Sequence, residues 1–126
     1  MGMDYKKIYD NIIKRSKNEK RKKYNGIYYE SHHIIPKCLG GDGNTKQWRT
    51  HHNIVLLTAR EHFICHWLLH NLYPDNKKLS MSFWVMCNLN NPKQKRYTPS
   101  SRIVEYSKIE MSKSKIGKIG FWKNNN

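Results

Sequence analysis

Acidic residues are scarce in this chain. Its 126 residues include 9 Asp and Glu against 24 Lys and Arg, which gives a formal charge of +15. So strong a positive charge in so short a chain calls for a polyanionic partner, and nucleic acid is the leading candidate. Hydrophobic residues are also few, at 37%. The length therefore allows one compact domain with a small core, and part of the chain is expected to lie outside that core.

Long apolar runs and cysteine pairs are missing as well. No apolar run approaches the roughly 18 residues of a membrane span. The first ten residues, MGMDYKKIYD, contain no apolar signal segment, so we expect a cytoplasmic protein that does not engage membranes. Cys38, Cys65 and Cys87 are odd in number and lack CxxC spacing, which favours reduced thiols over a disulfide scaffold or a zinc knuckle. We expect Cys38 and Cys65 to be small buried side chains.

The first apolar pattern predicts an amphipathic helix over residues 4–23. Tyr5, Ile8, Tyr9, Ile12 and Ile13 recur with helical spacing and form one apolar stripe. Beyond that stripe the pattern becomes basic on every face, with seven Lys and Arg among residues 14–23. The first half of the helix can dock on a core, whereas the second half is expected to be solvated or to face an anion.

The middle of the chain predicts a strand, a long loop, a second strand and a helix. These elements cover residues 27–35, 36–48, 53–57 and 59–72. Pro36 ends the first strand because proline cannot donate a hydrogen bond to a sheet. Thr58 and Glu61 match a capping box at the start of the helix, and Pro74 ends it. The order is that of a ββα unit.

The remaining sequence predicts helical flanks around this unit. A second buried helix is expected over residues 77–89, a third over 98–111, and a basic, flexible tail at the end. The fold class is therefore α+β. We divide the chain into an N-terminal helix with its basic segment, the ββα core, helices that pack on the core, and the tail. These segments cover residues 1–26, 27–73, 74–112 and 113–126.

Four of the seven histidines lie where they could meet one metal ion. His62 and His66 are four residues apart on a predicted helix, so their imidazoles share one face. His32 and His33 end the first predicted strand. A ligand from that strand would complete a site with three protein ligands and an open position, as in catalytic metal centres. Adjacent residues of an ideal strand point to opposite faces, so both can serve one site only if the strand ends or bulges there.

These residues resemble the HNH endonuclease motif. The resemblance runs through Glu30–Pro36, Gly40 and Gly41, Asn53–Thr58 and Arg60–His66 and covers about residues 27–72. It is nearest to the small phage-encoded HNH nucleases, including homing endonucleases, and its active site is similar to that of the colicin-type DNases. The resemblance implies a ββα-metal fold and a metal-dependent hydrolysis of phosphodiester bonds in double-stranded DNA. It also implies a bacteriophage origin and, with it, the cytoplasm of a host cell.

The resemblance also implies a role for each residue of the motif. His33 matches the general base that takes a proton from the attacking water, and His32, His62 and His66 match the metal ligands. Asn53 matches the residue that ties the loop to the strand and holds the base in place. The roles of three further residues stay open between phosphate contact, histidine orientation and, for the last, helix packing: Glu30, Arg60 and His70.

One divalent metal ion is the cofactor that follows from this ligand set. Three imidazoles suit Zn²⁺, Ni²⁺ or Mn²⁺ better than Mg²⁺ because imidazole is a softer ligand than oxygen. Related enzymes often turn over with Mg²⁺, so all four metals remain open. A single site in each chain predicts nicking by a monomer, and cleavage of both strands would need a homodimer or two successive cuts.

The basic segments beside the motif are candidate DNA contacts. They comprise Lys14, Arg15, Lys17, Lys20, Arg21, Lys22, Lys23 and Arg60. Such contacts bind phosphates without reading base sequence. Residues 111–118 resemble the start of a small modular DNA-binding motif, and a plain basic tail is the alternative. Two other functions stay open for the whole protein: a non-catalytic, zinc-stabilised DNA-binding module and an RNA-directed nuclease.

Overall fold

The protein is an α+β structure, as the sequence predicts. The computed structural model describes residues 3–88, 99, 100, 102, 103, 105 and 109, so the predicted third helix and the tail lie largely outside the described residues. Its elements are α1 (Tyr5–Asn18), β1 (Glu30–His33), the short 3₁₀ helices η1 (Lys37–Leu39) and η2 (Thr45–Gln47), β2 (Ile54–Leu57), α2 (Ala59–Leu72) and α3 (Lys77–Asn88). Among the residues described, no helix is both long and apolar enough to cross a membrane.

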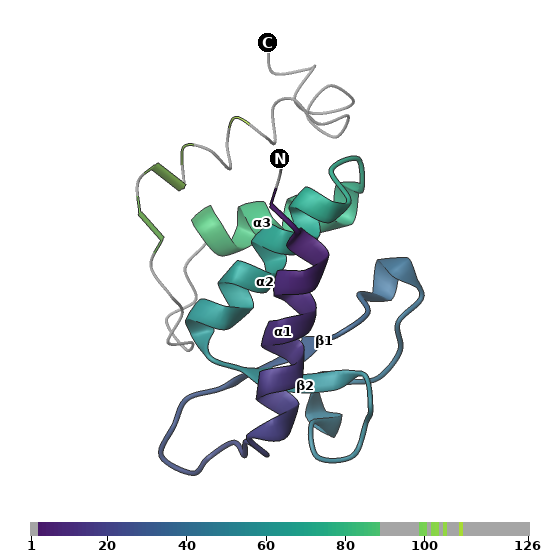
Figure 1. Ribbon diagram of the computed structural model, residues 1–126, viewed down its shortest axis with the longest axis vertical. Coiled ribbons are helices and arrows are strands. Elements are labelled where there is room, and N and C mark those ends of the chain that lie inside the picture. Colours follow the sequence, from purple (N-terminus) through teal and green to yellow (C-terminus); the bar gives the residue numbers. More distant parts are fainter. Residues whose placement is uncertain (1–2, 89–98, 101, 104, 106–108, 110–126) are drawn as a thin grey trace.

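The two strands form a small antiparallel sheet beneath the helices (Figure 1). Glu30 lies opposite Leu57, and His33 lies opposite Ile54. All four residues of β2 are buried, whereas burial alternates along β1. The first strand is shorter than the predicted range of 27–35, because the sheet has two strands and β2 offers only four residues to pair with.

The core confirms the apolar stripe expected on the first helix. Tyr9, Ile12 and Ile13 are buried against Leu57 and Leu68. The helices α1 and α2 lie side by side, and α3 packs on α2 (Figure 1). A second cluster around Phe63, Phe83 and Met86 joins α2 to α3. The helix that carries two of the candidate ligands is thus held from both sides.

The predicted extension of the first helix to residue 23 is wrong. The helix ends at Asn18, and the backbone then takes positive φ angles at Lys20 (50°) and Tyr24 (61°). The turn brings Arg21 back against the body of the protein, where its side chain is only 6% exposed. A continued helix would have kept this guanidinium in solvent, so an internal ion pair has overridden the local helical pattern.

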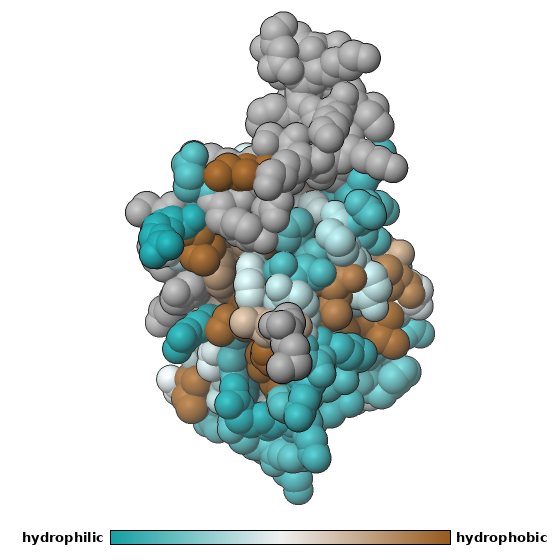
Figure 2. Space-filling model, turned by 45° about the horizontal axis from the view of Figure 1, so that its top comes forward, coloured by the Kyte–Doolittle hydropathy of each residue, from teal (hydrophilic) through white to brown (hydrophobic). Residues whose placement is uncertain are grey.

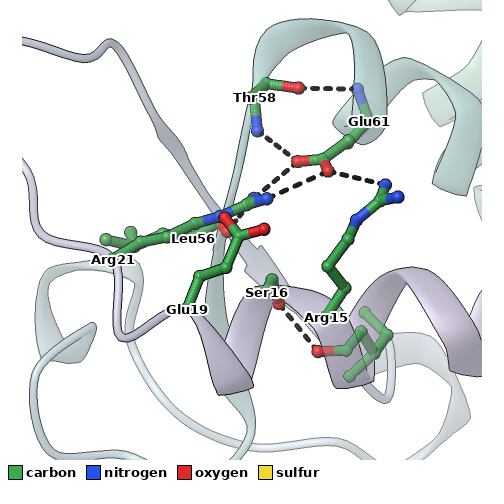
Figure 3. Close-up of polar contacts among 8 residues, drawn as sticks. Arg15, Ser16, Glu19, Arg21, Leu56, Thr58 and Glu61 are labelled. Carbon is green, nitrogen blue, oxygen red and sulfur yellow. Dashed lines mark hydrogen bonds and ion pairs between the residues drawn. The ribbon is translucent and has the colours of Figure 1, made fainter.

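The partner of that guanidinium is the Glu61 carboxylate (Figure 3). Arg21 donates to it through Nη1 at 2.5 Å and Nη2 at 3.1 Å, and Arg15 donates through Nη2 at 3.0 Å. The same carboxylate accepts the backbone N–H of Thr58 at 2.9 Å, which completes the capping box predicted for α2. Arg21 also donates to the Leu56 carbonyl at 3.1 Å. The Arg21–Glu61 pair therefore joins α1, the segment after it, β2 and the start of α2.

We expect Glu61→Gln to lower the free energy of unfolding by about 3 kcal/mol at neutral pH. The substitution keeps an oxygen for the cap but leaves the buried Arg21 guanidinium with the half-exposed Glu19 as its remaining counter-charge. Urea titration followed by circular dichroism measures the change. The matched control is Glu19→Gln, because Glu19 also contacts Arg21 but is half exposed, and should cost less than about 1 kcal/mol. Equal effects of the two substitutions would contradict this account.

The difference between wild type and Glu61→Gln should also depend on pH. Burial by itself would raise the pKa of Glu61, but the hydrogen bonds from Arg21, Thr58 and Arg15 and the charge of Arg21 together outweigh it and lower that pKa from its ordinary value of 4.5 to about 2. A lowered pKa in the folded state stabilises the protein above the ordinary value. We therefore expect the difference in unfolding free energy to be constant above about pH 5 and to shrink as the pH falls towards 2. A difference that stays unchanged through this range would show that the charge is not responsible.

Candidate active site

Three imidazoles converge where β1 meets α2. His32 lies opposite Val55 in the sheet and is 3% exposed, while His62 and His66 stand one turn apart on α2. One ring nitrogen from each of the three lies within 4.8 Å of the others. This is the group that helical spacing and strand position predict together. It could hold a metal ion.

Tyr9 sets which nitrogen of His32 can act as a ligand. Its hydroxyl donates to the Ile34 carbonyl at 2.7 Å and lies 2.7 Å from Nε2 of His32. Burial raises the pKa of Tyr9, so the phenol keeps its single proton and must accept from His32 Nε2–H. The lone pair of His32 is then on Nδ1. Burial, followed by the neighbouring His62 and His66, lowers the pKa of His32, which favours the neutral form that a metal binds.

Glu30 does the same for His62. Its Oε1 lies 2.7 Å from Nδ1 of His62. A carboxylate oxygen only accepts, so Nδ1 carries the proton and Nε2 carries the lone pair. That Nε2 faces Nε2 of His66 at 3.1 Å. A carboxylate behind a histidine is the usual support of a metal ligand, and two imidazole nitrogens this close either share a proton or bind one metal. The donor set fits a divalent metal of the zinc type.

His33 is held differently from the other three. Its Nε2 lies 2.7 Å from the Gly43 carbonyl, so Nε2 donates and Nδ1 keeps a lone pair. Asn53 fixes the same loop: it accepts from the backbone N–H of Ile35 at 2.9 Å and donates to the carbonyls of Ile35 and Asp42 at 3.1 and 2.8 Å. The loop expected between the two strands is thus folded back onto them.

Glycine is required at one point of this loop by a close approach. A Cβ built on Gly41 would lie 1.7 Å from the Ile35 carbonyl oxygen and 2.9 Å from Nδ2 of Asn53. The backbone can therefore reach the Asn53 amide only where no side chain is present. The sequence pair Gly40 and Gly41 signals this loop, but not the contact that makes the second glycine necessary.

All four histidines line one cavity of about 290 Å³. The objection that His32 and His33 should point to opposite faces is met because β1 ends at His33. Two lysines that sequence reasoning missed, Lys37 and Lys78, line the same cavity. Lys37 lies on η1 shortly after β1, whereas Lys78 comes from α3, and no motif indicated either of them. The cavity thus combines imidazole nitrogens with the positive charge of two exposed lysines.

In a second group of possible ligands, the hydrogen bonds do not leave the lone pair on the nitrogen that a metal would need. Asp42, His51 and His52 also have one ligand atom each within 4.8 Å of the others. However, the backbone N–H of Asn53 donates to Nδ1 of His51 at 3.1 Å, so the neutral ring carries its proton on Nε2, the nitrogen 3.7 Å from Asp42. A metal on Nε2 of His51 would require the proton to be on Nδ1. That proton would then face the backbone N–H of Asn53, which is also a donor. We assign no metal to this group.

The structure separates the predicted DNA contacts into two kinds. Lys14, Lys17, Lys20, Lys22 and Arg60 are exposed, and Lys23 is half-buried. Arg15 is exposed but pairs with Glu61, and Arg21 departs from the expectation because its guanidinium is buried in its ion pairs. Its charge is neutralised inside the protein.

His70 and the two cysteines singled out in the sequence lie in different surroundings. His70 is buried, with its Nδ1 3.2 Å from Ser80 Oγ and its ring stacked on Phe83 at 5.3 Å. It thus serves the contact between α2 and α3, the alternative left open for it. Cys65 is buried as expected, but the expectation for Cys38 is wrong: this thiol is exposed beside the cavity. Its position on η1, in a loop, could not be read from its residue type.

Comparison with curated proteins finds relatives in Enterobacteria phage T4. The chain is 37% identical to "Probable mobile endonuclease E" over 117 residues, which is 93% of this chain and 76% of that protein. It is 44% identical to "Probable mobile endonuclease D" over 87 residues and 40% identical to "Probable mobile endonuclease B" over 86. Each of these two matches spans 68% of this chain, but only 31% and 30% of the longer relatives.

These likenesses define the class of the protein. No model of a protein family matches the chain, and no solved structure matches it. The match to endonuclease E nevertheless covers most of both sequences. The chain belongs to the family of the phage T4 mobile endonucleases.

We expect Glu30→Gln to weaken metal binding about 10- to 100-fold, because the neutral amide no longer orients and polarises His62. Calorimetric titration of the purified protein with Zn²⁺, and with Co²⁺ followed by visible absorption, measures this affinity. Asp10→Asn is the control, since Asp10 is exposed on α1 and pairs with Lys6. Unchanged affinity in Glu30→Gln would mean that the carboxylate does not support the ligand.

Proposed function

We propose that this protein is a metal-dependent DNA endonuclease of the HNH type, which hydrolyses phosphodiester bonds. The observation that carries the proposal is the pairing of two kinds of histidine in one cavity. Tyr9 and Glu30 select the lone pairs of His32 and His62, which lie beside His66. His33 stands beside these three with a lone pair on Nδ1. The phage relatives are named probable mobile endonucleases, and these names support the same reaction.

His33 is the proposed general base. Its Nδ1 would accept the proton of the attacking water, because imidazole is neutral and basic near physiological pH. The Gly43 carbonyl, which accepts from Nε2 at 2.7 Å, would stabilise the positive charge that the ring then carries. Asn53 and Gly41 help to keep this carbonyl in place by fixing the loop just before it. Proton transfer thus depends on backbone geometry as much as on the histidine itself.

His32, His62 and His66 are the proposed ligands of one divalent metal. When bound, such an ion contacts a phosphate oxygen and stabilises negative charge at the phosphorus. Glu30 would hold His62 in its liganding tautomer, and Tyr9 would hold His32 in its own. Lys37 and Lys78, on the wall of the cavity, would add positive charge for the phosphate backbone. The metal ion, whether Zn²⁺, Mn²⁺, Ni²⁺ or Mg²⁺, is left to experiment.

Double-stranded DNA is the proposed substrate, and nicking is the expected product of one chain. The charge of +15 supports a nucleic acid, and a single proposed centre can cut one strand for each binding event. A phage origin, with action in the host cytoplasm, agrees with the T4 relatives. A non-catalytic, zinc-stabilised DNA-binding module is the alternative. It would need the three ligands but gives no reason for a fourth histidine held by Gly43 in the same cavity.

The proposal predicts that His33→Ala loses nicking but keeps the metal. Conversion of supercoiled plasmid to the open circle, with Mg²⁺, Mn²⁺, Ni²⁺ or Zn²⁺, should slow by about 100- to 10,000-fold, the usual contribution of a general base. Zn²⁺ titration should give the wild-type affinity. His62→Ala should lose both metal binding and cleavage.

The same assay separates the alternatives. If wild type and His33→Ala both shift duplex DNA and neither cuts it with any of the metals, the binding module is the better account. If structured RNA is cut faster than duplex DNA at matched salt, the substrate assignment is wrong. Cleavage that persists in His33→Ala would remove the general base from the proposal.

Gly43→Ala tests whether the loop carbonyl positions the base. Gly43 has a φ of +102°, and a Cβ there would lie 2.9 Å from ring atoms of His51. The carbonyl that holds His33 must therefore move, and we expect plasmid nicking to slow by about 10- to 100-fold. The control is Gly26→Ala, which has a similar φ of +92° but meets no atom within 4 Å. If both substitutions slow nicking equally, backbone strain rather than the His33 contact is the cause.

A further inference from the structure

A basic groove lies outside the cavity of the four histidines. It consists of two hollows of about 740 and 330 Å³. Both hollows are lined by Lys20, Arg21, Trp48 and Arg49, so they adjoin each other. The segment after α1 forms one wall and the loop around η2 forms the other, at the lower end of the molecule in Figure 1. Figure 2 shows that hydrophilic residues cover this end.

The groove is strongly and uniformly positive. Of the described residues that line it, none is acidic. Arg21 is neutralised by Glu61 and Glu19, and it serves as a fixed floor. The remaining cations, Lys17, Lys20, Lys22, Lys23 and Arg49, have no ion pair within the described part of the chain. A surface of this charge binds polyanions and concentrates them by long-range attraction.

Two aromatic side chains set this groove apart from a plain basic surface. Tyr24 is 90% exposed, and its backbone is held in the left-handed region, with φ of 61°. Trp48 is half-buried, and the Arg49 guanidinium lies 4.2 Å from the centre of its ring. Neither ring belongs to the two core clusters. Aromatic faces among cations are the recurring means by which proteins stack the bases of single-stranded nucleic acid.

The groove reaches the loop that holds the proposed base. His51 lines its smaller hollow, and its ring lies against Gly43, 2.9 Å from where a Cβ on that glycine would be. Gly43 in turn accepts from His33. A strand bound in the groove therefore ends beside the loop that positions the reacting group, and not on a distant face of the protein.

We propose that this groove binds unpaired nucleotides of the DNA substrate next to the phosphate that is cut, with Trp48 and Tyr24 stacking on bases. Bases within an intact duplex already stack on their neighbours, so only unpaired bases can use these rings. The adjacency to cleavage rests on the proposed function, but the binding does not. The lysines contribute affinity for any DNA, and the aromatic rings contribute a preference for unpaired bases.

Binding to two DNA probes tests this in a cleavage-deficient background. Full-length His33→Ala protein, without divalent metal, is titrated by fluorescence anisotropy. One probe is a short duplex, and the other is the same duplex with a gap of a few unpaired nucleotides. We expect tighter binding of the gapped probe. Trp48→Leu and Tyr24→Leu should each weaken binding of the gapped probe about 10-fold while leaving the intact duplex unchanged.

Matched variants separate stacking from charge and from misfolding. The double variant Lys22→Ala, Lys23→Ala should weaken the binding of both probes to the same extent and reduce the salt dependence of binding. Tyr73→Leu is the control for an exposed aromatic residue outside the groove, and should change neither affinity. Trp48→Phe keeps a stacking face and should restore most of the preference for the gap, which a variant that merely unfolds would not do.

Three results would overturn the inference. The first is equal affinity of the parent protein for the two probes, and the second is an equal loss of affinity for both probes in Trp48→Leu. The third is tighter binding of single-stranded RNA than of the gapped DNA. A preference for the gap that depends on Trp48 would support it even if wild-type protein cuts no plasmid. In that case the proposed function fails and the groove remains a nucleotide-binding site. The two proposals therefore fail separately.

Discussion

A single carboxylate makes this fold possible in a chain with so few acids. Glu61 caps α2, accepts Arg15 from α1 and neutralises Arg21, which the chain after α1 turns inward. Without that counter-charge, the buried guanidinium would keep only the half-exposed Glu19 carboxylate and the Leu56 carbonyl as partners. The inward turn of the basic segment would lose its main stabilising contact. The same contact orients α2, which carries His62 and His66, and it forms the floor of the basic groove. The stability of the fold, the orientation of the candidate site and the shape of the basic groove thus all depend on Glu61.

The chemistry of the site depends on which ring nitrogen of each histidine carries the proton, and not only on the presence of the histidines. Tyr9, Glu30 and the Gly43 carbonyl each accept or direct one ring proton, and so decide which nitrogen of His32, His62 and His33 has a lone pair. The same reasoning excludes a metal at His51, whose Nδ1 accepts from the backbone. Histidine clusters that look alike in sequence therefore differ in what they can bind.

Local patterns predicted the central elements well. The capping box, the helix from 59 to 72 and the apolar stripe of α1 are set by interactions between residues close in sequence, so they could be read directly. The end of α1 could not, because Arg21 leaves the helical pattern for a carboxylate 40 residues away. The exposure of Cys38 and the packing of His70 could not be predicted from the sequence for the same reason. Each depends on which other element of the fold lies against that side chain.

Spacing and composition are properties of the chain alone, and they were enough to predict the α+β class, the ββα order, the positive charge and the four histidines of the candidate site. The tautomers of His32, His33 and His62, the meeting of Lys37 and Lys78 at one cavity, and the groove between Tyr24 and Trp48 depend on the folded arrangement. These features join segments that are remote in sequence. Their geometry comes from packing and hydrogen bonds that no local pattern encodes.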